Sequence, residues 1–75
     1  MMIKEDLVDP FTTFKLGLCY EAGSGVNEDI EESIRNYSLA ADANHPGALY
    51  NLGLCYEAGV GVEQNSEEAV DLFRK

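Results

Sequence analysis

The chain has 75 residues, of which 14 are Asp or Glu and 5 are Lys or Arg, so its formal net charge is −9. This length allows one small domain, which buries only about 60% of the surface that its unfolded chain exposes. The acidic balance excludes nucleic-acid binding, which draws its affinity from Lys and Arg beside phosphates. It also argues against anionic membrane surfaces.

The N-terminal segment carries Glu5 and Asp6 where a signal peptide would need an apolar stretch. No stretch of the chain has the length and apolar character of a membrane span. We therefore expect a cytoplasmic protein whose two cysteines stay reduced. Residues 1–9 are expected to form an N-terminal tail or a weak cap.

An internal repeat organises the rest of the chain. The segment Leu-Gly-Leu-Cys-Tyr-Glu-Ala-Gly occurs at residues 16–23 and again at residues 52–59, 36 positions later. When residues 10–39 are aligned with residues 46–75, 13 of the 30 pairs are identical. A repeat of this period is typical of a solenoid. We predict one unit at residues 10–45 and a second, C-terminally incomplete unit at residues 46–75.

Each unit is predicted to contain two helices. The first helix begins at Pro10, because proline suits the first helical turn, and ends at Gly23, because glycine readily adopts the left-handed conformation. The second helix follows Asp29, which forms a capping box with Glu32, and stops at Asn44. The second unit repeats three of these signals and has Asn at the capping position: Pro46, Gly59, Asn65 and Glu68.

Apolar spacing predicts the buried faces of these helices. Glycine in a helix interior costs up to about 1 kcal/mol against alanine, so we expect a neighbouring helix to approach Gly17 and Gly53 closely. Phe14 and Tyr50 are expected to pack between the units. The stripe of the first helices comprises Leu16, Cys19, Tyr20, Gly23, Leu52, Cys55, Tyr56 and Gly59. The face of the second helices comprises Ile30, Ser33, Ile34, Tyr37, Ala40, Ala41, Ser66, Ala69, Val70 and Phe73.

The motif Leu-Gly-x-x-Tyr-x-x-Gly-x-Gly-Val, present at residues 16–26 and 52–62, resembles that of the Sel1-like repeat family, a branch of the tetratricopeptide-like solenoids. Asp29, Tyr37 and the pair Ala40-Ala41 agree with the family's second helix. The resemblance implies an all-α fold, an α/α superhelical solenoid of two Sel1-like helix-turn-helix repeats. It also implies an adaptor or scaffold that holds protein partners in a groove, and no catalysis.

No group of side chains predicts an active site. Cys19 and Cys55 occupy equivalent positions on helices whose axes lie roughly 8–10 Å apart, too far for a disulfide, so we interpret them as small buried hydrophobes. A nucleophilic cysteine would need a base, and the single histidine, His45, lies in a loop. The glycine-rich loops lack the Lys of a phosphate site. We therefore expect a protein that is not an enzyme and has no catalytic residue, cofactor or metal.

A candidate partner-binding strip lies on the first helices, opposite the main apolar stripe. Leu18 and Leu54 are apolar where the Sel1-like motif is variable and often polar. An apolar strip with acidic neighbours suits an extended or helical peptide that has apolar anchors and basic flanks. The predicted partner-binding residues are Leu18, Leu54, Lys15, Asn51, Glu21 and Glu57.

The sequence thus predicts a non-catalytic module that presents a solenoid groove to protein or peptide partners, a basic partner among them. The alternative is a structural fragment of a larger protein that carries an enzymatic or signalling domain elsewhere. Because solenoids need about three repeats for stability, such a fragment would self-associate through its incomplete repeat ends.

Overall fold

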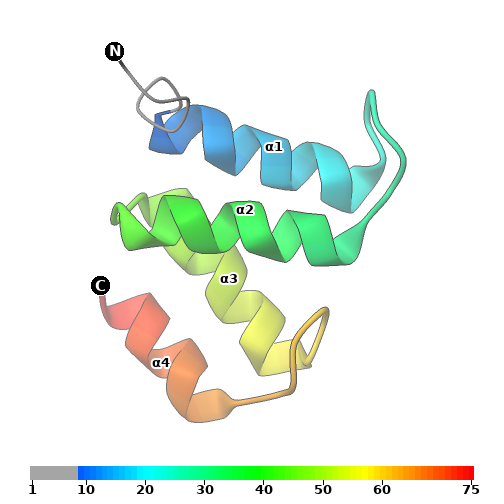
Figure 1. The fold of residues 1–75 in the computed structure, drawn as a ribbon. Helices are drawn as coiled ribbons and strands as arrows, with labels where there is room; N and C mark the ends of the chain where they lie inside the picture. Colours follow the sequence, from blue (N-terminus) through cyan, green and yellow to red (C-terminus); the bar gives the residue numbers. More distant parts are fainter. Residues whose placement is uncertain (1–8) are drawn as a thin grey trace.

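The computed structural model describes residues 9–75, which form two helix-turn-helix pairs (Figure 1). The helices of this part are α1 (Pro10–Ala22), α2 (Ile30–Asp42), α3 (Pro46–Ala58) and α4 (Ser66–Arg74). The predicted all-α solenoid is confirmed. Most of the predicted tail lies outside the described residues, and its last residue, Asp9, caps α1. None of these four helices is long and apolar enough to cross a lipid bilayer.

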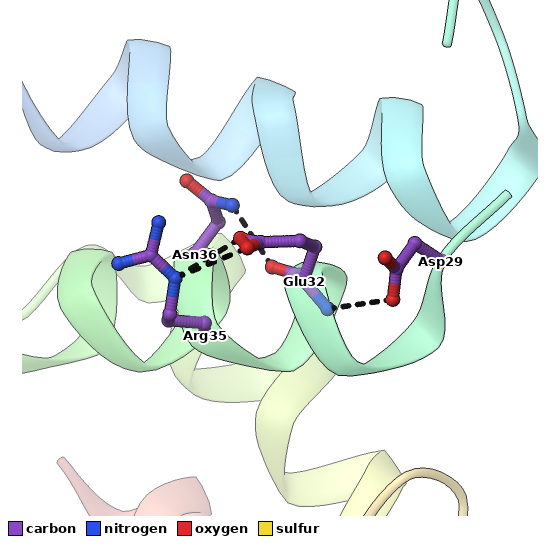
Figure 2. Close-up of polar contacts among 4 residues, drawn as sticks. All are labelled: Asp29, Glu32, Arg35 and Asn36. Carbon is purple, nitrogen blue, oxygen red and sulfur yellow. Dashed lines mark hydrogen bonds and ion pairs between the residues drawn. The ribbon is translucent and has the colours of Figure 1, made fainter. Parts of the chain in front are cut away.

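Side-chain caps determine where the helices begin. Asp29 Oδ1 accepts the backbone N–H of Glu32 at 3.1 Å, as predicted (Figure 2). Asn65 makes the equivalent bond at the start of α4. His45 was predicted only as a loop residue, but its Nδ1 accepts the backbone N–H of Ala48 at 3.2 Å and caps α3.

The reciprocal half of the predicted capping box is absent at the start of α2. The Glu32 carboxylate instead accepts a bond from Arg35 Nε at 3.0 Å, one turn along the same helix (Figure 2). The backbone N–H of Asp29 donates to the carbonyl of Tyr20 at 2.9 Å. This bond ties the start of α2 to the last turn of α1, and Asn65 makes the corresponding bond to α3.

The helix ends follow the predicted left-handed residues. Gly23 and Gly59 have φ values of 70° and 72° and cap α1 and α3. Asn44, just beyond α2, has a φ of 64°, so its predicted role as a stop is confirmed. These sharp ends keep the connections short, and consecutive helices therefore pack against each other.

The core lies along α2 and α3 and continues onto α4. A Cβ added at Gly17 would lie 2.6 Å from Cδ1 of Tyr37, and a Cβ at Gly53 would collide with the Phe73 ring. The predicted close approach to both mid-helix glycines is therefore confirmed. The buried cluster comprises Tyr37, Ala40, Ala41, Ala48, Leu49, Leu52 and Leu72.

The prediction of one buried stripe per helix is wrong at both ends of the solenoid. Leu16 is 41% exposed, whereas its repeat, Leu52, is 5% exposed. Val70 and Phe73 are also exposed, and Leu72, which the predicted face omitted, is buried. The reason is that α2 and α3 each have a packed helix on two sides, whereas α1 and α4 pack chiefly on one.

Phe14 and Tyr50 were predicted to pack between the repeats, and only Phe14 does so. The Phe14 ring packs against the core and against Gly47 of the second repeat, where an added Cβ would lie 3.0 Å from Phe14 Cζ. Tyr50 is exposed and contacts Phe73 of its own repeat, with ring centroids 5.8 Å apart. No helix among the described residues follows α4 to cover Tyr50.

Candidate protein-binding groove

An apolar groove of about 570 Å³ lies between α1 and α3 and crosses the boundary between the repeats. Leu18 and Leu54, which are 40% and 38% exposed, face it from equivalent positions. The groove is therefore a product of stacking, because neither repeat contains both walls. Its lining comprises Leu18, Glu21, Ala22, Asn51, Leu54, Cys55, Ala58 and Val60.

The repeated sequence explains the shape of this groove. Residues four positions apart share a helix face, so Ala22 follows Leu18 along α1 and Ala58 follows Leu54 along α3. The small alanine side chains leave a hollow beside the larger leucines. Val60, in the loop after α3, completes the lining.

Glu21 is the one charged residue among the described residues that line the groove. Glu21 is exposed as a residue, and one of its carboxylate oxygens, Oε1, accepts a partly buried hydrogen bond from the hydroxyl of Tyr37 on α2. The Tyr37 side chain is fully buried. Burial, with the hydrogen bond to Glu21 as the second cause, raises the pKa of Tyr37 to about 12. The Tyr37 phenol therefore stays protonated at neutral pH, and its hydroxyl remains a hydrogen-bond donor to the Glu21 carboxylate.

The two cysteines are free thiols, and both are half-buried rather than fully buried. Cys55 lines the groove, where burial and the nearby Glu21 carboxylate raise the pKa of its thiol. Because the thiolate is the reactive form of cysteine, Cys55 acts at neutral pH as a small apolar wall residue. The interpretation of both cysteines as small buried hydrophobes is thus met only in part.

The structure brings four of the six predicted residues into the groove: Leu18, Glu21, Asn51 and Leu54. Lys15 lies outside it, with Nζ 5.4 Å from the centroid of the Phe11 ring. Glu57 is exposed and also lies outside the lining. Ala22, Cys55, Ala58 and Val60 were not predicted, although the four-residue spacing from the leucines was a signal for the two alanines.

The chemistry that the groove offers is apolar contact, one amide and one carboxylate. Within residues 9–75, no group of three or more His, Cys, Asp or Glu side chains is placed to hold a metal ion. All buried polar side-chain atoms in this range have hydrogen-bond partners. Because most of its lining residues are apolar, the groove resembles a binding surface.

Comparisons with known proteins agree with this architecture. A crystal structure of a Sel1 repeat protein from Oxalobacter formigenes matches with a TM-score of 0.88 and 40% identity, over 97% of this chain and 30% of that one. A protective antigen present in uropathogenic Escherichia coli strains, displaying an SLR fold, matches with a TM-score of 0.83 and 37% identity, over 87% of this chain and 14% of that one. A search of curated proteins gives no significant match.

The chain thus spans less than a third of the length of either solved structure. The sequence pattern of the Sel1 repeat matches residues 11–45 and 46–75. Sel1 repeats are generally protein–protein interaction modules. On this sequence match, and on the two structural matches, the chain belongs to the Sel1 repeat family.

Proposed function

We propose that this chain is a non-catalytic interaction module that binds a segment of a partner protein in the groove between α1 and α3. The observation that carries this proposal is the pair Leu18 and Leu54, exposed side by side in one apolar groove. Burying a fully exposed leucine side chain contributes about 1.5–3 kcal/mol, and a partner gains the share of this that belongs to the exposed 40% of Leu18 and 38% of Leu54. Two such residues give a partner segment a substantial apolar anchor.

The size of the groove supports a short ligand segment. Its volume of about 570 Å³ accommodates a few side chains, whereas a folded domain would need a far larger surface. A helix or an extended strand that presents apolar side chains at regular spacing fits such a groove. The cytoplasmic compartment expected from the sequence stays a prediction.

Selection from a random peptide library on the immobilised chain tests this proposal. Enriched peptides are measured by fluorescence anisotropy against the wild type, Leu18→Asp and Leu54→Asp. We expect each substitution to weaken binding by roughly tenfold or more, which corresponds to 1.4 kcal/mol. Far-UV circular dichroism should show unchanged helicity, because both leucines lie at the surface.

Leu16→Asp is the matched control for these variants. Leu16 is as exposed as Leu18 but lies outside the groove, so its substitution should leave peptide affinity unchanged. The proposal is wrong if no peptide is enriched. It is also wrong if Leu16→Asp weakens binding as much as Leu18→Asp.

Self-association is a second candidate function, favoured by the exposed side chains at the C-terminal end. Tyr50, Val70 and Phe73 are exposed, whereas the corresponding residues of the first repeat, Phe14, Ile34 and Tyr37, are partly or fully buried. A second copy stacked head to tail would cover this surface. Sedimentation velocity tests the idea, since a folded monomer at micromolar concentration contradicts it.

One contact favours the groove over such stacking. Phe14 of the first repeat packs closely over Gly47 of the second, where an added Cβ would lie 3.0 Å from Phe14 Cζ. In a head-to-tail pair, Phe11 of the second copy would occupy the position that corresponds to Gly47. It would then press against Tyr50 of the first copy, which corresponds to Phe14. This crowding weakens a head-to-tail pair, so we place peptide binding first.

A further inference from the structure

We propose that the groove selects a partner segment in which a Lys or Arg side chain lies beside an apolar side chain, and that Glu21 receives the cation. This inference rests on the proposed function and names the chemistry of its ligand. The leucines supply apolar contact that any hydrophobic segment satisfies. Glu21 supplies the charge that distinguishes one segment from another.

The charges around Glu21 are the first support for this proposal. Among the described residues, the one ion pair joins Glu32 and Arg35 on α2, so no Lys or Arg in residues 9–75 neutralises Glu21. Glu21 is an exposed residue in an otherwise uncharged, mostly apolar lining. An electrostatic interaction is stronger beside apolar walls than in bulk water. A cation entering the groove therefore meets a carboxylate that makes no ion pair with any Lys or Arg of residues 9–75.

The ordered position of the Glu21 carboxylate is the second support for the proposal. The Tyr37 hydroxyl donates to Oε1, and the buried Tyr37 ring is held against Gly17 of α1. The side chain of Glu21 is thus ordered before a ligand arrives, which reduces the entropy lost on binding. Its second oxygen, Oε2, accepts no hydrogen bond from the described residues and is available to an ammonium or guanidinium group.

The second repeat provides an internal contrast. Glu57 occupies the position equivalent to Glu21, but Phe73 replaces Tyr37 and offers no hydroxyl. Glu57 also lies outside the groove lining. The two glutamates therefore share their sequence surroundings and differ in anchoring and location. Glu57→Gln changes the net charge by the same amount as Glu21→Gln, so it controls for the general attraction of an acidic protein for basic peptides.

The experiment compares peptides selected from one random library on three immobilised proteins: the wild type, Glu21→Gln and Glu57→Gln. We expect Lys and Arg to be enriched beside apolar residues in the peptides selected on the wild type and on Glu57→Gln. This enrichment should disappear on Glu21→Gln. One selected peptide and its Lys→Gln form are then titrated, and the lysine form should bind the wild type about fivefold more tightly, as for a favourable exposed ion pair.

The outcomes separate this inference from the proposed function. If apolar peptides are enriched without a bias for Lys or Arg, the groove binds ligands but the role of Glu21 is wrong. Equal loss of the bias in Glu21→Gln and Glu57→Gln overturns it too, because the preference then reflects net charge. If no peptide is enriched on the wild type, the proposed function fails and this inference fails with it.

Discussion

The two copies of Leu-Gly-Leu-Cys-Tyr-Glu-Ala-Gly have identical residues but different surroundings. Leu16 is 41% exposed in α1, whereas Leu52 is 5% exposed in α3. In the loop just beyond each copy, a Cβ added at Gly61 would meet Ile30 Cγ2 at 2.6 Å, whereas a Cβ at Gly25 would meet nothing within 4 Å. Burial, and the stability that it gives, therefore belongs to the interface between repeats and not to the repeated sequence itself.

In the second helix of each repeat, the more exposed residue is instead the one in the second repeat. Tyr37 of α2 is fully buried, whereas Phe73 of α4 is 43% exposed. Within residues 9–75, α1 packs chiefly on α2 and α4 chiefly on α3, so the first helix of the first repeat and the second helix of the second repeat each keep a more exposed face. Matched substitutions at equivalent positions measure how much the neighbouring repeat stabilises the copy that it covers.

The largest expected difference lies between Leu52→Ala and Leu16→Ala. Truncating the buried Leu52 should lower the free energy of unfolding by about 2–5 kcal/mol, whereas the exposed Leu16 should lose roughly 0.5 kcal/mol. Urea unfolding followed by far-UV circular dichroism measures both. If Leu52→Ala does not fold, Leu52→Met should still fold with a loss below about 1.5 kcal/mol. Equal losses for the two alanine variants would mean that Leu16 is covered in solution.

The next difference concerns Gly61→Ala and Gly25→Ala. Both glycines have positive φ, 75° and 79°, so each substitution should cost about 1–2 kcal/mol of backbone strain. At Gly61 the new methyl group also presses on Ile30 and Ile34, which should add about 1–3 kcal/mol. The same urea titrations measure the difference. A difference of zero would show that the second loop shifts freely and stabilises no repeat interface.

A smaller difference is expected between Gly17→Ala and Gly53→Ala. Alanine gains up to about 1 kcal/mol of helix propensity at either position. At Gly17 the new Cβ meets the buried Tyr37 ring, and the crowding should cost about 1–3 kcal/mol. The Phe73 ring beside Gly53 is partly exposed and turns away more easily. We therefore expect Gly17→Ala to be the less stable variant, and the reverse order would contradict this account of the two rings.

The last effect is confined to alkaline pH and leaves the stability at neutral pH unchanged. The folded state raises the pKa of Tyr37 from 10.0 to about 12, because burial and the bond to Glu21 favour the neutral phenol. The resulting stability is fully present below pH 10 and is lost as the pH rises towards 12. Tyr37→Phe should lack this particular pH dependence, as measured by urea unfolding at several pH values. The difference in tyrosinate absorbance between the wild type and Tyr37→Phe belongs to Tyr37 and should titrate near pH 12.

Local signals made the helices predictable from the sequence. Asp29, Gly23 and Asn44 act within one helical turn, so their roles do not depend on distant contacts. Burial was predicted less well, because eight identical residues cannot encode two environments. The exposure of Leu16 follows from what stacks on α1, and this is a property of neighbouring segments.

The same distinction applies to the candidate site. Leu18 and Leu54 were predicted to share a surface because the repeat places them at equivalent positions, and both line the groove. Lys15 was included for its place on the helix, but its side chain extends to Phe11, one turn earlier, as long helical side chains tend to do. Val60 could not be predicted, since a loop residue reaches the groove only through the arrangement of the stacked repeats.

The packing of α2 and α3 has a consequence for how the chain opens. These two middle helices pack on both sides, whereas the nine-residue α4 packs chiefly on α3 (Figure 1). Local opening starts where buried contacts are fewest, so amide hydrogens in α4 should exchange first and those of α2 and α3 last. The part of the chain that is most stable against local opening then consists of the second helix of one repeat and the first helix of the next. It is displaced by one helix from the unit that the sequence repeats.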